Sequence, residues 1–284
     1  MKVLITFLSQ LLNYIKKESL VAAVREQKLL ETIGRLRSLV PDVSQQESRL
    51  IEFNDFWELK RRGLHAFQSD LMLKAICQEN KEPVVVADIG DSAGTHMLYL
   101  KGLNPDKRIE TYSVNLDARA VKKIQDRGLK AILKRAEEIE AEDIGGKDCV
   151  DLFTSFEMIE HLHNPTIFLK RIADRTSCRK MVVTVPYLKH SRVGLYHIRK
   201  RSTKDIFAEE VHVFELKPED WTLLFLHAGW KVSFEKVYFQ YPRKIPVFSQ
   251  LLGYVWEKTD FRGFWGAILE KDSTYKDLYQ DWEA

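Results

Sequence analysis

Residues 84–96 read Val-Val-Val-Ala-Asp-Ile-Gly-Asp-Ser-Ala-Gly-Thr-His, and they say more about the fold than any other stretch. The apolar, β-branched run at their start is typical of a buried parallel strand. The run ends at Asp88-Ile-Gly90, and Gly94 follows shortly after. Because glycine tolerates positive φ and has no Cβ, this turn predicts that a ligand comes close to the backbone.

Downstream of this strand, strand-like and helix-like patterns alternate, which predicts an α/β fold with a sheet covered on both faces. We expect strands at about 109–116, 131–133, 151–155 and 181–185, and helices from about 95, over 118–127, over 165–175 and over 221–228. Two late strands, near 231–239 and 263–269, are joined by a long segment without a clear pattern. The sheet should therefore be mostly parallel, with the last strand antiparallel.

The N-terminal part of the chain is expected to be helical, over 1–40 and again over about 45–79. Apolar residues recur on one face of the first helix, at Leu4, Leu8, Leu11, Leu12 and Ile15. Three partners suit that face: the rest of the chain, a second subunit, or a membrane surface. We expect two parts, a helical extension over 1–62 and a ligand-binding domain over 63–284.

Composition excludes several classes of protein. The chain has 284 residues, 45% of them hydrophobic and 30% charged, which is ordinary for a globular protein. A net charge of +3 is too small to indicate general nucleic-acid binding. The three cysteines (Cys77, Cys149 and Cys178) are scattered, without a Cys-x-x-Cys pair, which suits a reducing compartment and predicts a cytoplasmic protein.

Several blocks of the sequence resemble one enzyme family. Residues 88–94 resemble motif I of the class I S-adenosylmethionine-dependent methyltransferases, Asp-Ile-Gly-x-Gly-x-Gly, with Ser92 in place of the middle glycine. Residues 151–165 resemble the fourth-strand motif of the small-molecule O-methyltransferases, and 212–230 their closing helix and Ala-Gly-aromatic turn. The resemblance implies a Rossmann-like sheet, S-adenosylmethionine as cofactor, and methyl transfer to an oxygen of a small-molecule or glycan-type acceptor.

The resemblance also assigns cofactor contacts to the ends of four strands. Asn115 stands where the family has an acidic residue that binds the ribose, with Asp117 two positions later; Asp117 could equally be a helix N-cap. Arg135 departs from the family's acidic residue beside the adenine. The expected cofactor-binding residues are Asp88, Gly90, Ser92, Gly94, Asn115, Asp117, Ala136, Glu137, Ser155 and Phe156.

A candidate metal site follows the fourth strand. Glu157, Glu160 and His161, expected on one face at the start of a helix, together with His212 offer oxygen and nitrogen ligands. They resemble the metal site of the small-RNA 2′-O-methyltransferases, which implies a divalent cation such as Mg²⁺ that activates a substrate hydroxyl. Two alternatives stay open: His161 and Glu160 act as catalytic residues without a metal, or the group only caps the helix.

Other functions remain open from sequence. Residues 189–204 hold six Lys or Arg and no acid, so they could cover the site and bind an anionic acceptor, or form a solvated loop. Ser92 and Asn115 depart from the family pattern and would also suit a non-catalytic binding or scaffold protein. RNA 2′-O-methylation is a further alternative, although no RNA-binding module is recognisable. A nicotinamide-binding loop is disfavoured because it would need glycine at Ser92 and Thr95.

Overall fold

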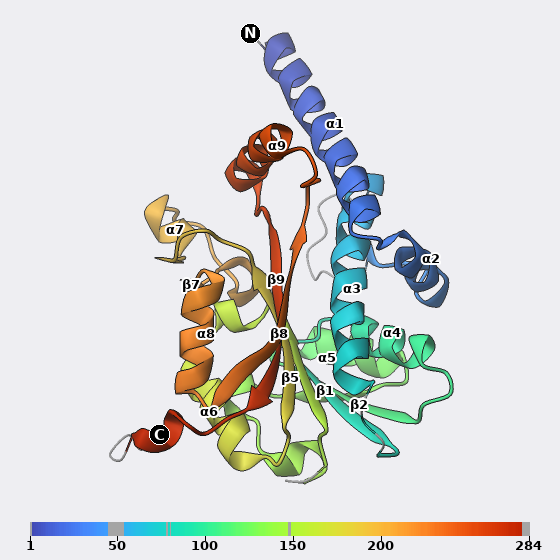
Figure 1. The fold of residues 1–284 in the computed structure, drawn as a ribbon, viewed down its shortest axis with the longest axis vertical. Coiled ribbons are helices and arrows are strands. Elements are labelled where there is room, and N and C mark those ends of the chain that lie inside the picture. The colour runs from blue at the N-terminus through green and yellow to red at the C-terminus, as the bar shows by residue number, and fades with distance from the viewer. Residues whose placement is uncertain (1, 45–53, 78, 80, 147–148, 280–284) are drawn as a thin grey trace.

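A seven-stranded sheet organises the protein, with helices on both faces (Figure 1). The computed structural model describes residues 2–44, 54–77, 79, 81–146 and 149–279. The strands are β1 (Val84–Ile89), β2 (Ile109–Asn115), β3 (Lys130–Leu133), β4 (Leu152–Phe156), β5 (Lys180–Pro186), β8 (Trp230–Phe239) and β9 (Gly263–Lys271). Their order is β3-β2-β1-β4-β5-β9-β8, and only β9 runs antiparallel to its neighbours. The expected fold class is confirmed.

Two hydrophobic cores, one on each face, hold the sheet between its helices. Alternate residues of β1 enter opposite cores, since side chains of a strand alternate in direction: Val84 and Val86 enter one, and Val85, Ala87 and Ile89 the other. The helices of the α/β repeat are α4 (Thr95–Leu103), α5 (Ala118–Asp126), α6 (Pro165–Arg175) and α8 (Pro218–His227). Parallel strands buried on both faces need apolar residues throughout, which is why their positions were predictable.

Three N-terminal helices pack on the first core: α1 (Lys2–Glu26), α2 (Leu30–Leu39) and α3 (Asp55–Ile76). Arg62 of α3 is fully buried and donates to Glu58, to the Pro41 carbonyl and to the Tyr99 hydroxyl. The expected boundary between residues 62 and 63 therefore falls inside α3, which contacts both α1 and the sheet. Within the described residues, no helix is long and apolar enough to cross a membrane.

The expected helix over 1–40 is interrupted between α1 and α2, where Lys28 adopts a φ of 61°. The expected stretch 45–53 of the second helical segment lies outside the described residues, as do the side chains of Leu4 and Leu8. Of the predicted apolar face of α1, Leu11 and Ile15 are exposed. Among the side chains of α1 that the structure describes, the buried ones lie in its C-terminal half and include Leu20 and Val24.

The segment between the last two strands differs from the prediction. It holds a fourteen-residue helix, α9 (Pro246–Thr259), in place of an irregular connection. Pro246 occupies its first turn, where a missing N–H costs nothing. Residues 189–204 are not wholly irregular either, because they contain α7 (Tyr196–Arg199) and the short strand β6 (Arg192–Val193), which pairs with β7 (Phe214–Glu215).

Gly266 of β9 tests how closely α3 packs on the sheet. A Cβ there would lie 2.4 Å from Leu71 Cδ1 and 2.8 Å from Phe67 Cζ, both on α3. We expect Gly266→Val to lower the free energy of unfolding by about 1–3 kcal/mol, because a packed core cannot absorb the added methyl groups. The control is Gly34→Ala on α2, where a Cβ meets nothing within 4 Å and the change should stabilise by about 0.5–1 kcal/mol. Urea unfolding measures both; a Gly266→Val protein as stable as the parent would contradict this packing.

Candidate functional site

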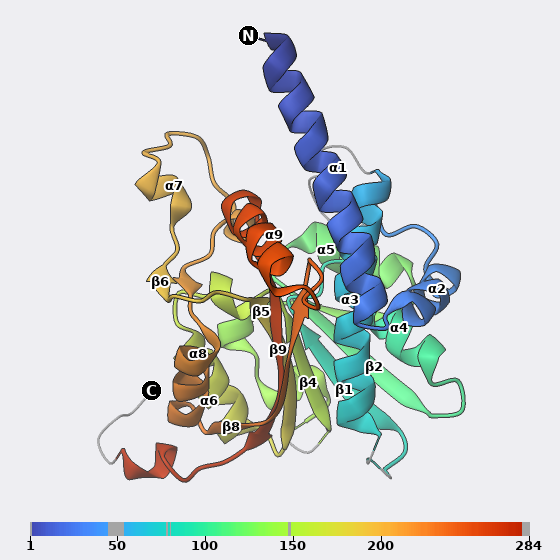
Figure 2. The same cartoon turned by 45° about the horizontal axis from the view of Figure 1, so that its top comes forward.

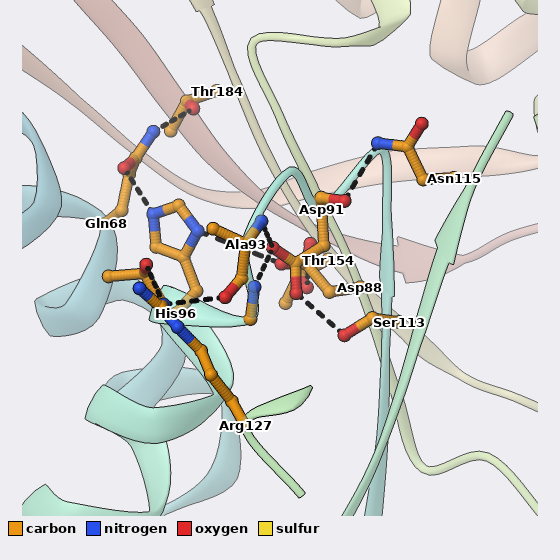
Figure 3. Close-up of polar contacts among 12 residues, drawn as sticks. Gln68, Asp88, Asp91, Ala93, His96, Ser113, Asn115, Arg127, Thr154 and Thr184 are labelled. Atoms are coloured by element: carbon orange, nitrogen blue, oxygen red, sulfur yellow. Dashed lines mark hydrogen bonds and ion pairs between the residues drawn. The ribbon is translucent and has the colours of Figure 1, made fainter. Parts of the chain in front are cut away.

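The turn between β1 and α4 has the geometry that its glycines predicted. Gly90 and Gly94 adopt φ values of 91° and 73°, and the Gly90 N–H donates to the Val114 carbonyl. Asp91, which sequence analysis missed, holds the turn: its carboxylate accepts from the backbone N–H groups of Ala93 (3.0 Å) and Gly94 (2.7 Å) and from the Ser113 hydroxyl (2.7 Å), as Figure 3 shows. The signal that could have revealed it is a carboxylate two and three residues before those N–H groups.

Asp88, at the end of β1, is buried with too few hydrogen-bond donors. One carboxylate oxygen accepts from the Thr154 hydroxyl (2.8 Å), while Oδ2 has no hydrogen bond from the described residues. Burial, and then the charge of Asp91, raise the pKa of Asp88 well above its usual range. Asp91 has three donors and Asp88 has one, so the negative charge resides on Asp91 and Asp88 keeps its proton.

A chain of side chains from three elements reaches Asp88 (Figure 3). Thr184 of β5 accepts from Gln68 Nε2 (2.9 Å), and Gln68 Oε1 lies 2.8 Å from His96 Nε2. Since that oxygen can only accept, His96 carries its proton on Nε2. Its Nδ1 therefore has a free lone pair that faces Asp88 Oδ2 at 3.7 Å. Burial lowers the pKa of His96 to about 3, so the ring is neutral at physiological pH.

Most of the residues predicted to contact the ribose and adenine form hydrogen bonds within the protein instead. Asn115 donates to the Asp91 carbonyl (2.8 Å) and accepts from the Asp117 N–H (2.8 Å). Asp117 is the N-cap of α5 and pairs with Arg119, as the alternative interpretation had it. Ala136 and Glu137 lie in a short 3₁₀ helix, where the Glu137 carbonyl accepts from Arg171.

The remaining predicted cofactor residues lie around the Gly90 turn. Phe156 packs against His96, with ring centroids 4.6 Å apart, and the Ser155 hydroxyl is buried without a hydrogen bond from the described residues. Ser92 is half-buried. Met158 covers Gly90, because a Cβ on that glycine would lie 2.4 Å from Met158 Cγ.

Three of the four predicted metal ligands converge. Glu160, His161 and His212 each offer a ligand atom, and these atoms all lie within 4.8 Å of one another. A backbone bond from the Val213 N–H to the Glu160 carbonyl (2.8 Å) joins the two segments that supply them. Glu157 is not a member of this group.

The expected helical arrangement of these residues is wrong. Glu157 adopts a φ of 52°, residues 159–161 form a single 3₁₀ turn, and α6 begins only at Pro165. Glu157 therefore does not share a helical face with Glu160 and His161. Periodicity could not reveal this, because a single left-handed residue breaks the helical spacing.

Burial makes this group electrostatically unusual. Both carboxylate oxygens of Glu160 are buried without hydrogen bonds from the described residues, and burial followed by the charge of Glu157 raises the pKa of Glu160 well above its usual range. Burial likewise raises the pKa of Glu157 to about 8, against a hydrogen bond from Thr184. Carboxylates in this state are stabilised by a nearby cation.

The two histidines each bring a ring nitrogen close to this carboxylate. His161 Nδ1 lies 2.9 Å from the carbonyls of Ala208 and Val211, which only accept, so Nδ1 carries the proton and Nε2 is free. Burial lowers the pKa of His161 to about 4. His212 Nδ1 lies 3.5 Å from Glu215, and its ring stacks on Phe261. This pattern, in which a protein acceptor orients each imidazole, is common at metal sites.

Comparison with known proteins supports the fold. No protein-family model matches the chain, and no curated protein matches it by sequence. Solved structures do match: a magnesium protoporphyrin IX methyltransferase from Synechocystis PCC 6803 with bound S-adenosylhomocysteine is 12% identical, with a TM-score of 0.53 over 86% of this chain and 95% of that one. The chain has the class I methyltransferase fold.

Two further structures limit what this fold implies about the reaction. A putative sarcosine dimethylglycine methyltransferase from Galdieria sulphuraria is 11% identical, with a TM-score of 0.53 over 75% of this chain and 88% of that one. A [4+2]-cyclase is 13% identical, with a TM-score of 0.52 over 88% and 96%. Because a cyclase shares the methyltransferase fold, the reaction has to be inferred from the site.

If Asp88 is protonated in the folded protein, the free energy of unfolding depends on pH. The folded state holds this proton at pH values where an unfolded aspartate, with its ordinary pKa of 3.8, has lost it. The contribution of Asp88 to stability therefore falls as the pH rises above about 4. We expect Asp88→Asn, which needs no proton, to be more stable than the parent, by a margin that grows between about pH 5 and pH 8. Urea unfolding at both pH values measures this, with the exposed Asp106→Asn as control; a margin independent of pH would show that Asp88 is ionised.

Proposed function

We propose that the protein is an S-adenosylmethionine-dependent methyltransferase that acts on an oxygen of a small-molecule acceptor. The observation that carries the proposal is the buried Asp88 oxygen without a donor, next to the left-handed turn of Gly90 and Gly94. An ammonium group such as that of S-adenosylmethionine would take the place of the Asp88 proton, because it donates to the carboxylate and neutralises its charge. Gly90 leaves the backbone open to the amino-acid part of such a ligand once Met158 moves aside.

The residues fit the cofactor less well at its ribose end. Asn115 is an amide in place of a carboxylate, and its hydrogen bonds lie within the turn. These contacts, and Met158 over Gly90, favour a second candidate, a non-catalytic binding protein with the same fold. Binding of S-adenosylhomocysteine, the demethylated product, separates the two candidates, because only the enzyme has to bind it.

When bound, S-adenosylmethionine supplies a methyl group on a positively charged sulfur. The protein must then align an acceptor oxygen, exclude water and accept its proton. His161 suits the proton-accepting role, since its Nε2 lone pair is free and the Ala208 and Val211 carbonyls fix the ring. Glu160 lies beside it within the same buried group.

A divalent cation is the second part of the proposal. Glu160, His161 and His212 would hold it, and it would lower the pKa of an acceptor hydroxyl. A set of two imidazoles and one carboxylate suits a transition ion such as Mn²⁺, Fe²⁺ or Zn²⁺ better than Mg²⁺, which prefers oxygen ligands. His161 Nε2 has one lone pair, so it either binds the metal or acts as the base, and the experiments below distinguish these roles.

The acceptor and the compartment are further proposals. Arg199, Lys200, Arg201 and Lys204 are exposed and would suit an anionic or glycan-type acceptor. The three cysteines are unpaired, which fits a cytoplasmic protein.

Gly90 tests the cofactor proposal. We expect Gly90→Ala to weaken binding of S-adenosylhomocysteine by at least about tenfold, because the new methyl group pushes Met158 across the turn and strains the positive φ. The matched control is Gly128→Ala, which has the same kind of φ (73°) but open space around the Cβ, and it should bind normally. Calorimetry measures both affinities. Absence of binding to the parent protein itself would favour the non-catalytic candidate.

Removal and rebinding of a metal test the proposed cation site. After treatment with a chelator, the protein should rebind Mn²⁺ or Zn²⁺ in calorimetry, and Glu160→Gln or His161→Ala should weaken that binding by more than about tenfold, since loss of a ligand exceeds loss of an outer contact. His163→Ala, an exposed neighbour, is the control. If no metal binds and methyl transfer survives chelation, the metal is excluded and His161 is left as the base.

A further inference from the structure

Helix α9 is apolar on both of its faces. Leu252, Gly253 and Trp256 are buried toward the protein. The solvent face is also apolar, with Val247 82% exposed and Leu251 59% exposed. A surface helix of a globular protein normally turns polar residues outward, so this outer face is suited to a partner.

Two more segments present apolar side chains on the same side of the molecule. In both views α7, α9 and the N-terminal half of α1 stand beyond the carboxyl ends of the strands (Figures 1 and 2). α1 and α9 touch, because Trp256 Nε1 donates to the Ser19 hydroxyl (2.9 Å) and Lys16 Nζ lies 4.6 Å from the Trp256 ring. We call the exposed apolar residues of these segments the apolar rim: Leu11, Tyr14, Ile15, Tyr196, Ile198, Ile245, Val247, Phe248, Leu251 and Tyr254.

Cations are interspersed with the apolar rim. Exposed basic residues flank α7 and both ends of α9: Arg199, Lys200, Arg201, Lys204, Arg243, Lys244 and Lys258. Lys200 lies over the ring of Tyr196 and Lys258 over that of Tyr254. The acids at the end of α9 are neutralised, Glu257 by Arg262 and Asp260 by Lys60. Exposed cations therefore outnumber the exposed acids around the rim, which include Glu18 of α1 and Asp205 and Glu210 after α7.

We propose that the apolar rim docks on the surface of an anionic phospholipid bilayer. Bulky apolar side chains on short helices, with Lys and Arg around them, match the interfacial layer, where apolar groups enter the acyl boundary and cations meet lipid phosphates. A second copy of the chain fits less well, because a contact between two rims would bring together two surfaces on which cations outnumber acids.

Docking in this orientation would bring the candidate site to the bilayer. The Ala208 and Val211 carbonyls that hold His161 belong to the segment that follows α7. Phe261, which stacks on His212, directly follows α9 and Asp260. An acceptor anchored in lipid could then reach Glu160, His161 and His212 from the membrane side; this consequence rests on the proposed function, whereas the docking does not.

Vesicle co-sedimentation of the full chain tests the docking. We expect the protein to sediment with phosphatidylcholine vesicles that contain phosphatidylglycerol, and several-fold less with vesicles of phosphatidylcholine alone. High salt should reduce sedimentation with the anionic vesicles, because it screens the charges. Phe248→Ser with Leu251→Ser should weaken the partition by at least about tenfold, because two apolar side chains no longer enter the interface. Replacing Arg199, Lys200 and Arg201 with Gln should weaken it by about fivefold for each charge.

The control is Leu223→Ser on α8, a helix residue 64% exposed and therefore similar to Leu251, which should sediment like the parent. Equal sedimentation with both vesicle types, or no loss in the Phe248 and Leu251 double variant, would overturn the proposal. A dimer in analytical ultracentrifugation that the same double variant dissociates would instead assign the rim to a second copy. Binding of S-adenosylhomocysteine is measured in parallel, so that a failed cofactor proposal and failed docking give different results.

Discussion

Buried carboxylates with too few hydrogen-bond donors dominate the carboxyl end of the sheet. Asp88 and Glu160 each keep oxygens without a partner among the described residues, and Glu157 adds a third raised pKa. Moving such groups out of water costs several kcal/mol, and this cost must be offset by the two hydrophobic cores below them. A protein retains an arrangement of this kind where a cationic ligand relieves it, which links the Asp88 turn and the Glu160 group to binding.

Rigid surroundings keep these groups in position without a ligand. Asp91 closes the β1–α4 turn through three hydrogen bonds, and Gln68 connects α3 to His96 of α4 and Thr184 of β5. Helix α3 is itself fixed on Gly266 of β9 and by the buried Arg62. The N-terminal helices therefore belong to the architecture of the site, since one of them supplies the side chain that orients His96.

The same end of the molecule combines two surfaces of opposite character. Its interior holds polar groups that lack partners, and its exterior, at α7 and α9, exposes apolar side chains that lack a cover. The segments after α7 and α9 connect them, through the carbonyls that hold His161 and through Phe261 against His212. A partner that covers the exterior would consequently act on the segments that orient the candidate ligands.

Local sequence determined the elements whose burial follows a simple pattern. The β1 strand and the boundaries of α6 could be predicted because a doubly covered strand is continuously apolar, and because Asn164 and Pro165 mark a helix start. Helix α9 was missed because residues apolar on both faces leave no periodicity. Asp91 is bound by Ser113 and His96 by Gln68, contacts that the local sequence does not show. Glu157 does not join the candidate metal ligands, and its own left-handed backbone breaks the expected helix. Hydrogen bonding and desolvation depend on contacts between residues far apart in the chain, so only the tertiary structure decided which polar side chains are satisfied and which remain available to a ligand.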